Sequence, residues 1–406
     1  MTGSNKIGIH DLALFGGARL FDTPRPIGQL AAPDVEEYLA LVRQAFEAGQ
    51  LTAHGRLELQ LEAELADYHG VRHCIALANA ALGLMMLAKH FAQDRHGEVI
   101  MPAFTFRGLP HFVQWAGQMP RFCDVDRHSH TLDLASVERA INERTTSIMS
   151  VCNFNSPGDI DGLCQLAKAH RLPIFFDSVY AVGCTYRGRK LGGFGTAEVY
   201  SLHATKLLNG FEGGYVTTDD DDLAGVLRRL RNGASNGTGL PGHALNARLN
   251  ELHAAMALLS LRQIGTVIEG NRKRFNSYQR VVENLPGLSL IPYPDARHEV
   301  SNYQMAVLEI DNSFPLSRNQ LMHLVRAEGL AISAYYSPAL HQSEHCPIGL
   351  KVDPLPITEW LAGRYLQLPV GELVSIADIE HIGELLGFVC QHGVAIAERL
   401  RERGIA

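Results

Sequence analysis

The feature that most constrains the fold is an alternation that runs from residue 73 to residue 218. Short apolar runs of strand length alternate with segments whose apolar residues recur at helical spacing. Parallel strands need crossovers of this kind, and a sheet that is covered on both faces has nearly continuous apolar strands. We therefore predict an α/β fold with a mostly parallel central sheet flanked by helices. The expected strands are 74–78, 98–102, 120–125, 145–154, 172–179, 197–203 and 213–218, and the helices between them are 82–91, 107–117, 134–142 and 162–170.

The segments on either side of this alternation extend the prediction. Four aspartates, Asp219–Asp222, are expected to cap and begin a helix over 223–232 rather than to bind a metal. A Gly-, Asn- and Ser-rich loop over 232–243 and a long helix over 250–284 should follow. We predict two domains, an N-terminal arm with a large cofactor-binding domain (1–270) and a smaller C-terminal α+β domain (271–406). The other expected helices are 34–48, 55–68, 317–329 and 375–404, and the other expected strands are 303–310 and 330–336.

Composition excludes several classes of protein. The formal net charge of −7 gives no electrostatic reason to expect a nucleic-acid partner. The seven cysteines form no CxxC pair, which predicts neither a metal site nor a disulfide framework and is compatible with a reducing compartment. The first residues lack the pattern of a signal peptide, and no apolar run approaches membrane-spanning length. We expect a cytoplasmic enzyme without a membrane partner.

The segment SLHATKLLNGFEGG, Ser201–Gly214, carries the candidate chemistry. Lys206 stands in its middle, three residues after a histidine and six before a glutamate. Asp177 ends the apolar strand IFF, where an ionised carboxylate is costly unless it is paired. That carboxylate could pair with the protonated pyridine nitrogen of pyridoxal phosphate (PLP), while Lys206 could form a Schiff base with its aldehyde and then move protons. Taken singly, Asp177 could be a cap and Lys206 a surface cation, but the pair favours a cofactor site.

This segment resembles the signature of the DegT/DnrJ/EryC1/StrS aminotransferases, a branch of the fold-type I PLP enzymes. Their signature is Ser-Phe-His-x-x-Lys followed by Glu-Gly-Gly, and Leu202 replaces the Phe here. The resemblance extends over nearly the whole chain, and NAALGLMML, FCDVD, GDIDGL and EVYSLHATK are most similar to the nucleotide-linked 4-keto-6-deoxyhexose 4-aminotransferases. It implies an enzyme that moves an amino group from Glu or Gln to a keto-sugar or a similar cyclic ketone. The implied route is a ping-pong mechanism through a Schiff base at Lys206.

Carried over residue by residue, the resemblance implies a set of cofactor contacts. Lys206 would bond to PLP and Asp177 would pair with its pyridine nitrogen. Phe106 would stack on the ring, Tyr180 would lie beside it, and Ser201 would hold the phosphate. Phe106 could instead be an ordinary core residue.

The resemblance also implies contacts at the phosphate and from the smaller domain. Backbone N–H groups at Ala80 and Ala81 would bind the phosphate at a helix N-terminus. Asn246 would reach the phosphate of a partner subunit, which implies a homodimer with active sites at the interface. In YYSPALH, Tyr336 and His341 would face the substrate. Asn246 could instead be a loop hydrogen-bonding residue, and His341 a surface residue.

Several pocket positions depart from the family pattern. Ala80 and Ala81 stand where Gly-Thr is common, Tyr180 replaces a His or Gln, and the stretch around Cys152 differs. The cofactor anchors are intact while the pocket lining is changed, so the substrate is the open question. Another PLP-dependent reaction, such as elimination or carbon–carbon bond formation on a non-sugar substrate, remains an alternative. A PLP-binding regulator is a third alternative, which the intact Lys206 and Asp177 disfavour.

Overall fold

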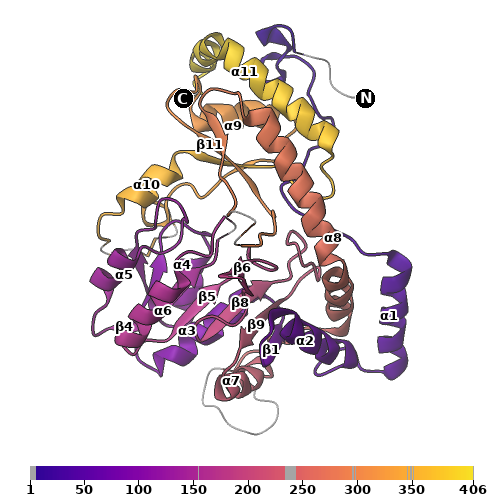
Figure 1. The fold of residues 1–406 in the computed structure, drawn as a ribbon, viewed down its shortest axis with the longest axis vertical. Helices are drawn as coiled ribbons and strands as arrows, with labels where there is room; N and C mark the ends of the chain where they lie inside the picture. The colour runs from indigo at the N-terminus through magenta and orange to yellow at the C-terminus, as the bar shows by residue number, and fades with distance from the viewer. Residues whose placement is uncertain are drawn as a thin grey trace.

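The computed structural model describes residues 6–405 except 154, 234–243, 295–296, 298, 345, 348–349 and 351. Figure 1 shows a larger α/β body below and a smaller body above, with the long helix α8 (Glu251–Val282) running from one to the other. The domain boundary that we predict at residue 270 falls inside this continuous helix. Residues 234–243 of the predicted loop lie outside the described residues.

The large body is built on a seven-stranded sheet in the order β1-β9-β8-β5-β4-β2-β3. Strands β8, β5, β4, β2 and β3 pair in parallel, whereas β9 runs antiparallel to both of its neighbours. The prediction of a mostly parallel sheet flanked by helices is therefore confirmed. The strands are β1 (His73–Leu77), β2 (Glu98–Pro102), β3 (Met119–Cys123), β4 (Thr145–Val151), β5 (Ile174–Asp177), β8 (Ala197–Ser201) and β9 (Gly214–Thr218).

Helices cover both faces of this sheet, because alternate strand residues point to opposite sides. Val99 and Met101 of β2 join the core under α3, α4 and α7, whereas Ile100 joins the core under α5 and α6. Helices α2 and α8 cover β1, β8 and β9 on the second face. The helices of the large body are α1 (Val35–Ala48), α2 (Arg56–His69), α3 (Ala80–Ala92), α4 (Leu109–Trp115), α5 (Leu134–Ala140), α6 (Ile160–Ala169) and α7 (Asp221–Arg231).

The smaller body packs helices against an antiparallel sheet in the order β10-β11-β13-β12. Leu308 and Leu366 from the sheet share a core with Leu324 of α9 and Leu385 of α11. Its elements are β10 (Leu288–Leu290), β11 (Ala306–Ile310), α9 (Arg318–Ala327), β12 (Ser333–Ala334), α10 (Pro356–Ala362), β13 (Tyr365–Leu368) and α11 (Ile376–Glu402).

The aspartate run takes the structural role predicted for it. Asp220 is the N-cap of α7, and its side chain accepts a hydrogen bond from the Leu223 N–H. Asp221 pairs with Arg72 at 2.7 Å. The run is therefore a capped and paired helix start.

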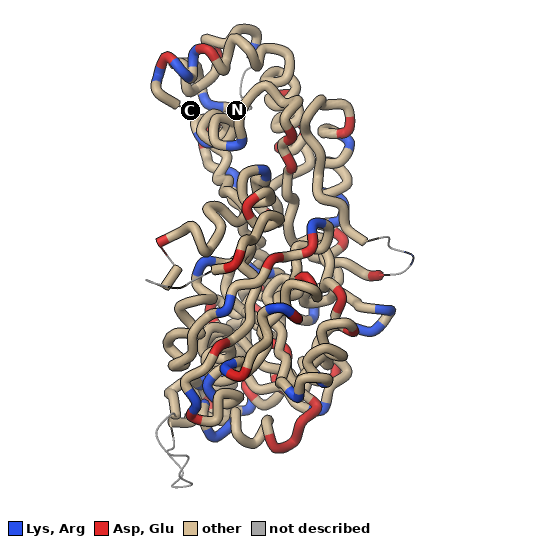
Figure 2. Tube along the Cα trace, turned by 90° about the vertical axis from the view of Figure 1, so that its left-hand side faces the viewer, with Lys and Arg blue, Asp and Glu red and all other residues tan. Residues whose placement is uncertain are grey.

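The charged residues of the described chain are mixed in sign. Figure 2 shows Lys and Arg interspersed with Asp and Glu along both bodies. None of the seven cysteines forms a disulfide. No helix within the described ranges is long and apolar enough to cross a membrane.

Candidate active site

Asp177 stands at the carboxyl end of β5, at the centre of the sheet. Its side chain is buried, with only 3% of the residue exposed, and its Oδ1 accepts a hydrogen bond from the Val179 N–H at 3.2 Å. Burial raises the pKa of Asp177 to about 6, although the Val179 N–H and the nearby Lys206 both oppose the rise. This carboxyl group therefore favours a cationic or proton-sharing partner at the edge of the sheet.

Lys206 is held by a compact loop between β8 and β9. The Leu202 N–H donates to the Gly213 carbonyl, the Gly210 N–H to the Leu202 carbonyl, and the Lys206 N–H to the His203 carbonyl. Leu202 is fully buried and anchors the loop in the core. The Lys206 Nζ lies 3.8 Å from the centre of the Tyr180 ring, a cation–π contact. The loop thus directs the amine toward the strand end that bears Asp177.

Asp177 and Lys206 line the same cavity, of about 430 Å³. Strand ends and helix starts that are far apart in sequence form its wall, as expected for the carboxyl edge of an open α/β sheet. The lining residues are Asn79, Ala80, Ala81, Leu84, Phe106, Leu109, Phe112, Asp177, Val179, Tyr180, Ser201, His203, Thr205, Lys206, Glu212 and Gly213.

The N-terminus of α3 opens onto this cavity and fits a phosphate group. Asn79 caps the helix by accepting a hydrogen bond from the Leu82 N–H. The N–H groups of Ala80 and Ala81 belong to the first turn of the helix and therefore have no intrahelical partner. A Cβ on Gly214 would come within 2.4 Å of the Ala80 nitrogen, so only glycine lets β9 approach this turn so closely. The donors, the buried carboxylate and the lysine together fit PLP, whose phosphate, ring nitrogen and aldehyde need these three kinds of group.

Most of the predicted cofactor residues meet at this cavity. Phe106, Tyr180 and Ser201 all line it, and Phe106 is 45% exposed, which excludes the interpretation of Phe106 as a core residue. The Ser201 Oγ accepts from the His203 N–H at 3.2 Å. Cys152 is fully buried, and burial raises its pKa well above the usual range.

Asn246 does not line the cavity of its own chain. It is exposed, and its Oδ1 accepts from the Arg248 Nε at 3.2 Å. The neighbouring Ala247 is buried and accepts from the Ala78 N–H at 2.8 Å, which fixes this segment beside the turn that precedes α3.

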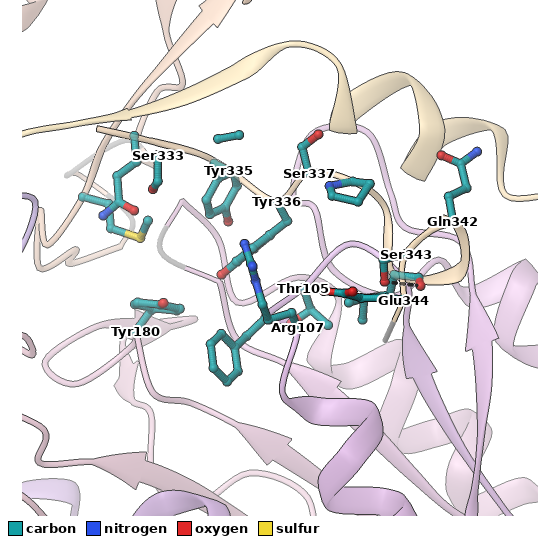
Figure 3. A pocket seen from close by; sticks show the side chains of 16 residues that line it. Thr105, Arg107, Tyr180, Ser333, Tyr335, Tyr336, Ser337, Gln342, Ser343 and Glu344 are labelled. Atoms are coloured by element: carbon teal, nitrogen blue, oxygen red, sulfur yellow. Dashed lines mark hydrogen bonds between the residues drawn. The ribbon is translucent and has the colours of Figure 1, made fainter. Parts of the chain in front are cut away.

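A second cavity, of about 450 Å³, adjoins the first and is lined by residues of both bodies (Figure 3). Phe106 and Tyr180 line both cavities. Tyr336 lines the second one from the smaller body. His341 lines neither cavity, because its Nε2 pairs with Glu359 at 3.1 Å.

Sequence reasoning assigned no role to several of the residues at the cavities. His203, Thr205 and Glu212 belong to the quoted segment, and the His203 Nδ1 and Thr205 Oγ1 lie 2.8 Å apart. Their spacing around Lys206 was a usable signal. Arg107 of the second cavity follows Phe106 directly, but a lone arginine in a loop carries no pattern that marks a site.

Comparisons with known proteins agree with this geometry. The family model described as DegT/DnrJ/EryC1/StrS aminotransferase family matches residues 33–387. A relative from Escherichia coli, dTDP-4-amino-4,6-dideoxy-D-glucose transaminase, is 26% identical over 356 residues, which cover 86% of this chain and 94% of that protein. A crystal structure of DesI in the presence of its TDP-sugar product has a TM-score of 0.91 and 37% identity, covering 97% of this chain and all of that one. DesV from S. venezuelae has a TM-score of 0.77 and 26% identity over 90% of this chain and 99% of that one.

Proposed function

The chain belongs to the DegT/DnrJ/EryC1/StrS aminotransferase family, whose members depend on PLP, and from that premise we propose a sugar aminotransferase. It moves an amino group from glutamate or glutamine to a keto-sugar that is linked to a nucleotide. The dTDP-sugar in the name of the Escherichia coli relative and the TDP-sugar product of DesI support this choice. They favour transamination over elimination or carbon–carbon bond formation.

The observation that carries the proposal is the meeting of Asp177 and Lys206 at one cavity, with the start of α3 in its wall. A buried carboxylate with one protein hydrogen bond and a lysine above an aromatic ring are separately unremarkable features of a fold. At a single cavity, together with the N–H groups at the start of α3, they match the ring nitrogen, the aldehyde and the phosphate of PLP. Bound covalently at Lys206, the cofactor would supply an electron sink for the amino-group carbon.

The residues of this chain then have distinct tasks. Asp177 holds a proton on the pyridine nitrogen, because a carboxylate in this buried place favours a shared proton over a free charge. The Lys206 Nζ would carry protons within the cavity. Phe106 and Tyr180 would orient the ring, and Ser201 with the N–H groups of Ala80 and Ala81 would hold the phosphate.

We also propose that the working unit is a homodimer. Val35, Leu39 and Phe46 of α1 are 64%, 46% and 60% exposed, and their spacing puts them on one face of the helix. Figure 1 shows α1 at the outer side of α8, and these three side chains keep about half or more of their surface exposed in the described chain. A second copy would cover this face and would bring Asn246, exposed on its own chain, to the neighbouring phosphate site.

The test is the donor half-reaction, which needs no knowledge of the acceptor. Holoenzyme is mixed with L-glutamate or L-glutamine in the absence of any acceptor, and the cofactor spectrum and the keto acid released are measured. We expect conversion to the pyridoxamine form with one equivalent of keto acid per site. A Lys206→Ala variant is the matched control and should release none. If neither donor reacts with the wild-type holoenzyme, the proposed donor is wrong.

A further inference from the structure

The second cavity is lined by an arginine, Arg107, to which the proposed cofactor chemistry gives no role. Arg107 follows β2 and lines the cavity from the large body, opposite Ser333, Tyr336 and Ser337 of the smaller body. Figure 3 shows its side chain reaching from the loop toward Tyr336, with Gln342 at the other end of the cavity. A guanidinium in such a wall offers five donors with fixed geometry.

Arg107 has no partner in the protein that would neutralise it. Within the described chain it forms no ion pair or hydrogen bond, and it is exposed to the cavity. By contrast, Arg231 and Arg25 are each paired with carboxylates. Arg107 is therefore free to bind an anion that enters the cavity.

A second arginine increases the positive character of the same wall from behind. Arg318, at the start of α9, is only 9% exposed, and its Nη2 donates to the Ser337 Oγ at 2.9 Å. Its Nη1 is buried and has no hydrogen-bond partner in the described chain. Arg318 does not line the cavity itself, but its hydrogen bond fixes the Ser337 hydroxyl in the wall that Arg107 also lines.

The remaining wall suits a ligand that is part polar and part apolar. The Tyr336 hydroxyl is buried near Tyr180, and burial raises the pKa of Tyr336 well above its usual value, so it stays a neutral donor. Phe106 and Tyr180 connect this cavity with that of Lys206. A substrate whose reacting carbon lies at Lys206 can therefore extend an anionic group toward Arg107.

We infer that the cavity at Arg107 is an oxyanion subsite, in which Arg107 binds a carboxylate or phosphate of the substrate while the reacting carbon lies at Lys206. This inference rests on the proposed function. The same chemistry has two sources, the side-chain carboxylate of the amino donor and the phosphate groups of a nucleotide-linked sugar. A charge-assisted guanidinium contact of this kind predicts dissociation constants about tenfold to a hundredfold weaker when the arginine is lost.

The experiment uses holoenzyme and titration calorimetry with two probes, glutarate for a carboxylate and thymidine diphosphate for a phosphate. The variants are Arg107→Gln and Arg107→Lys, and the matched control is Arg139→Gln, at an exposed arginine of α5 that lines neither cavity. We expect Arg107→Gln to raise the dissociation constant of at least one probe about tenfold or more. Arg107→Lys should recover part of this loss of affinity, and Arg139→Gln should bind both probes as the wild type does. Loss for glutarate alone assigns the donor carboxylate, and loss for thymidine diphosphate alone assigns the phosphate.

Three results would contradict the proposed subsite. The first is unchanged affinity of Arg107→Gln for both probes, and the second is an equal loss of affinity in Arg139→Gln. The third is failure of the wild-type holoenzyme to bind either probe. The visible absorbance of bound cofactor and the glutamate half-reaction are recorded on the same samples. If the wild type binds cofactor and reacts with glutamate while Arg107→Gln binds both probes normally, only the subsite is wrong. If the wild type reacts with no donor, the proposed function itself fails, whichever way the probes bind.

Discussion

Asp177 illustrates how a single residue can cost stability for the sake of its chemistry. It is buried at a strand end, and burial raises its pKa from the ordinary value of 3.8 to about 6. The folded apoprotein therefore binds this proton at a higher pH than the unfolded chain does. The contribution of Asp177 to the free energy of unfolding is therefore largest below about pH 4 and falls as the pH rises toward about 6.

Replacing Asp177 with Asn should stabilise the apoprotein at neutral pH. The ionisation cost is removed, which by linkage amounts to about 3 kcal/mol at most above pH 6. The difference in melting temperature between Asp177→Asn and wild-type apoprotein should be present at pH 7.5 and shrink toward pH 4. The same variant should lose about 10²–10³ in turnover as holoenzyme, because a contact that stabilises developing charge is gone. Equal apoprotein stability at both pH values together with full activity would show that Asp177 is only a cap.

At the scale of elements, the sequence predicted the long helices and the strands of the large sheet, but it missed two strands of the smaller sheet. Helices α1, α2, α8 and α11 have apolar spacing over 14 residues or more, so their bounds agree closely with the prediction. Strands β10 and β13 have three and four residues and exist through their pairing with β11. Such pairing is non-local and leaves no periodic pattern. Strand β12 is shorter than the run 330–336 that was expected to form it.

The candidate site shows the same division between local and non-local information. Lys206 and Ser201 stand in one segment, and the sequence could predict that they act at one site. The second cavity joins Arg107 to Tyr336, which are separated by more than half of the chain. Only the packing of the smaller body on the larger one brings these two residues to one wall, so no local pattern could have predicted it.

The junction of α7 with α2 and β1 depends on one buried cation. Arg231 is fully buried, and its Nη1 lies 2.9 Å from Glu58, 2.5 Å from Glu62 and 2.8 Å from the Ala76 carbonyl. Burial raises the pKa of Glu58, while Arg231 lowers it. The carboxylates of Glu58 and Glu62 are thus both neutralised by the one guanidinium of Arg231, at the end of α7.

Arg231→Leu should destabilise the protein by about 3–5 kcal/mol, because it leaves buried charges without a partner. Chemical unfolding measures the change. Arg229→Leu, at an exposed position of the same helix, is the control and should stay within about 0.5 kcal/mol of the wild type. The triple variant Arg231→Met, Glu58→Gln, Glu62→Gln should recover most of the loss. If Arg231→Leu unfolds at the wild-type denaturant concentration, the cluster does not anchor this junction.

At the scale of the whole molecule, the account requires two chains. Asn246 is exposed and lies outside the cavity of its own chain, and Val35, Leu39 and Phe46 form an exposed apolar face on α1. In the proposed homodimer, a second copy would cover the apolar face of α1, and Asn246 would reach the phosphate site of that copy.

Asn246→Ala should raise the PLP dissociation constant by about tenfold to a hundredfold, because a hydrogen bond to a charged phosphate is lost. The spectrum of bound cofactor should stay unchanged. Mixing inactive Lys206→Ala chains with Asn246→Ala chains sharpens the test, because the site that keeps Lys206 then borrows Asn246 from its neighbour. Tight cofactor binding should return in the mixture. No recovery on mixing, or a fully active monomer in sedimentation, would contradict a shared site.

The central claim is that Lys206 is the residue to which the cofactor is bonded. The direct measurement is borohydride reduction of the holoenzyme, followed by proteolysis and mass spectrometry of the modified peptide. The account predicts that the reduced cofactor is fixed to Lys206 and that Lys206→Ala, treated in the same way, carries no label. Recovery of the label on any other lysine, with Lys206 unmodified, would contradict it.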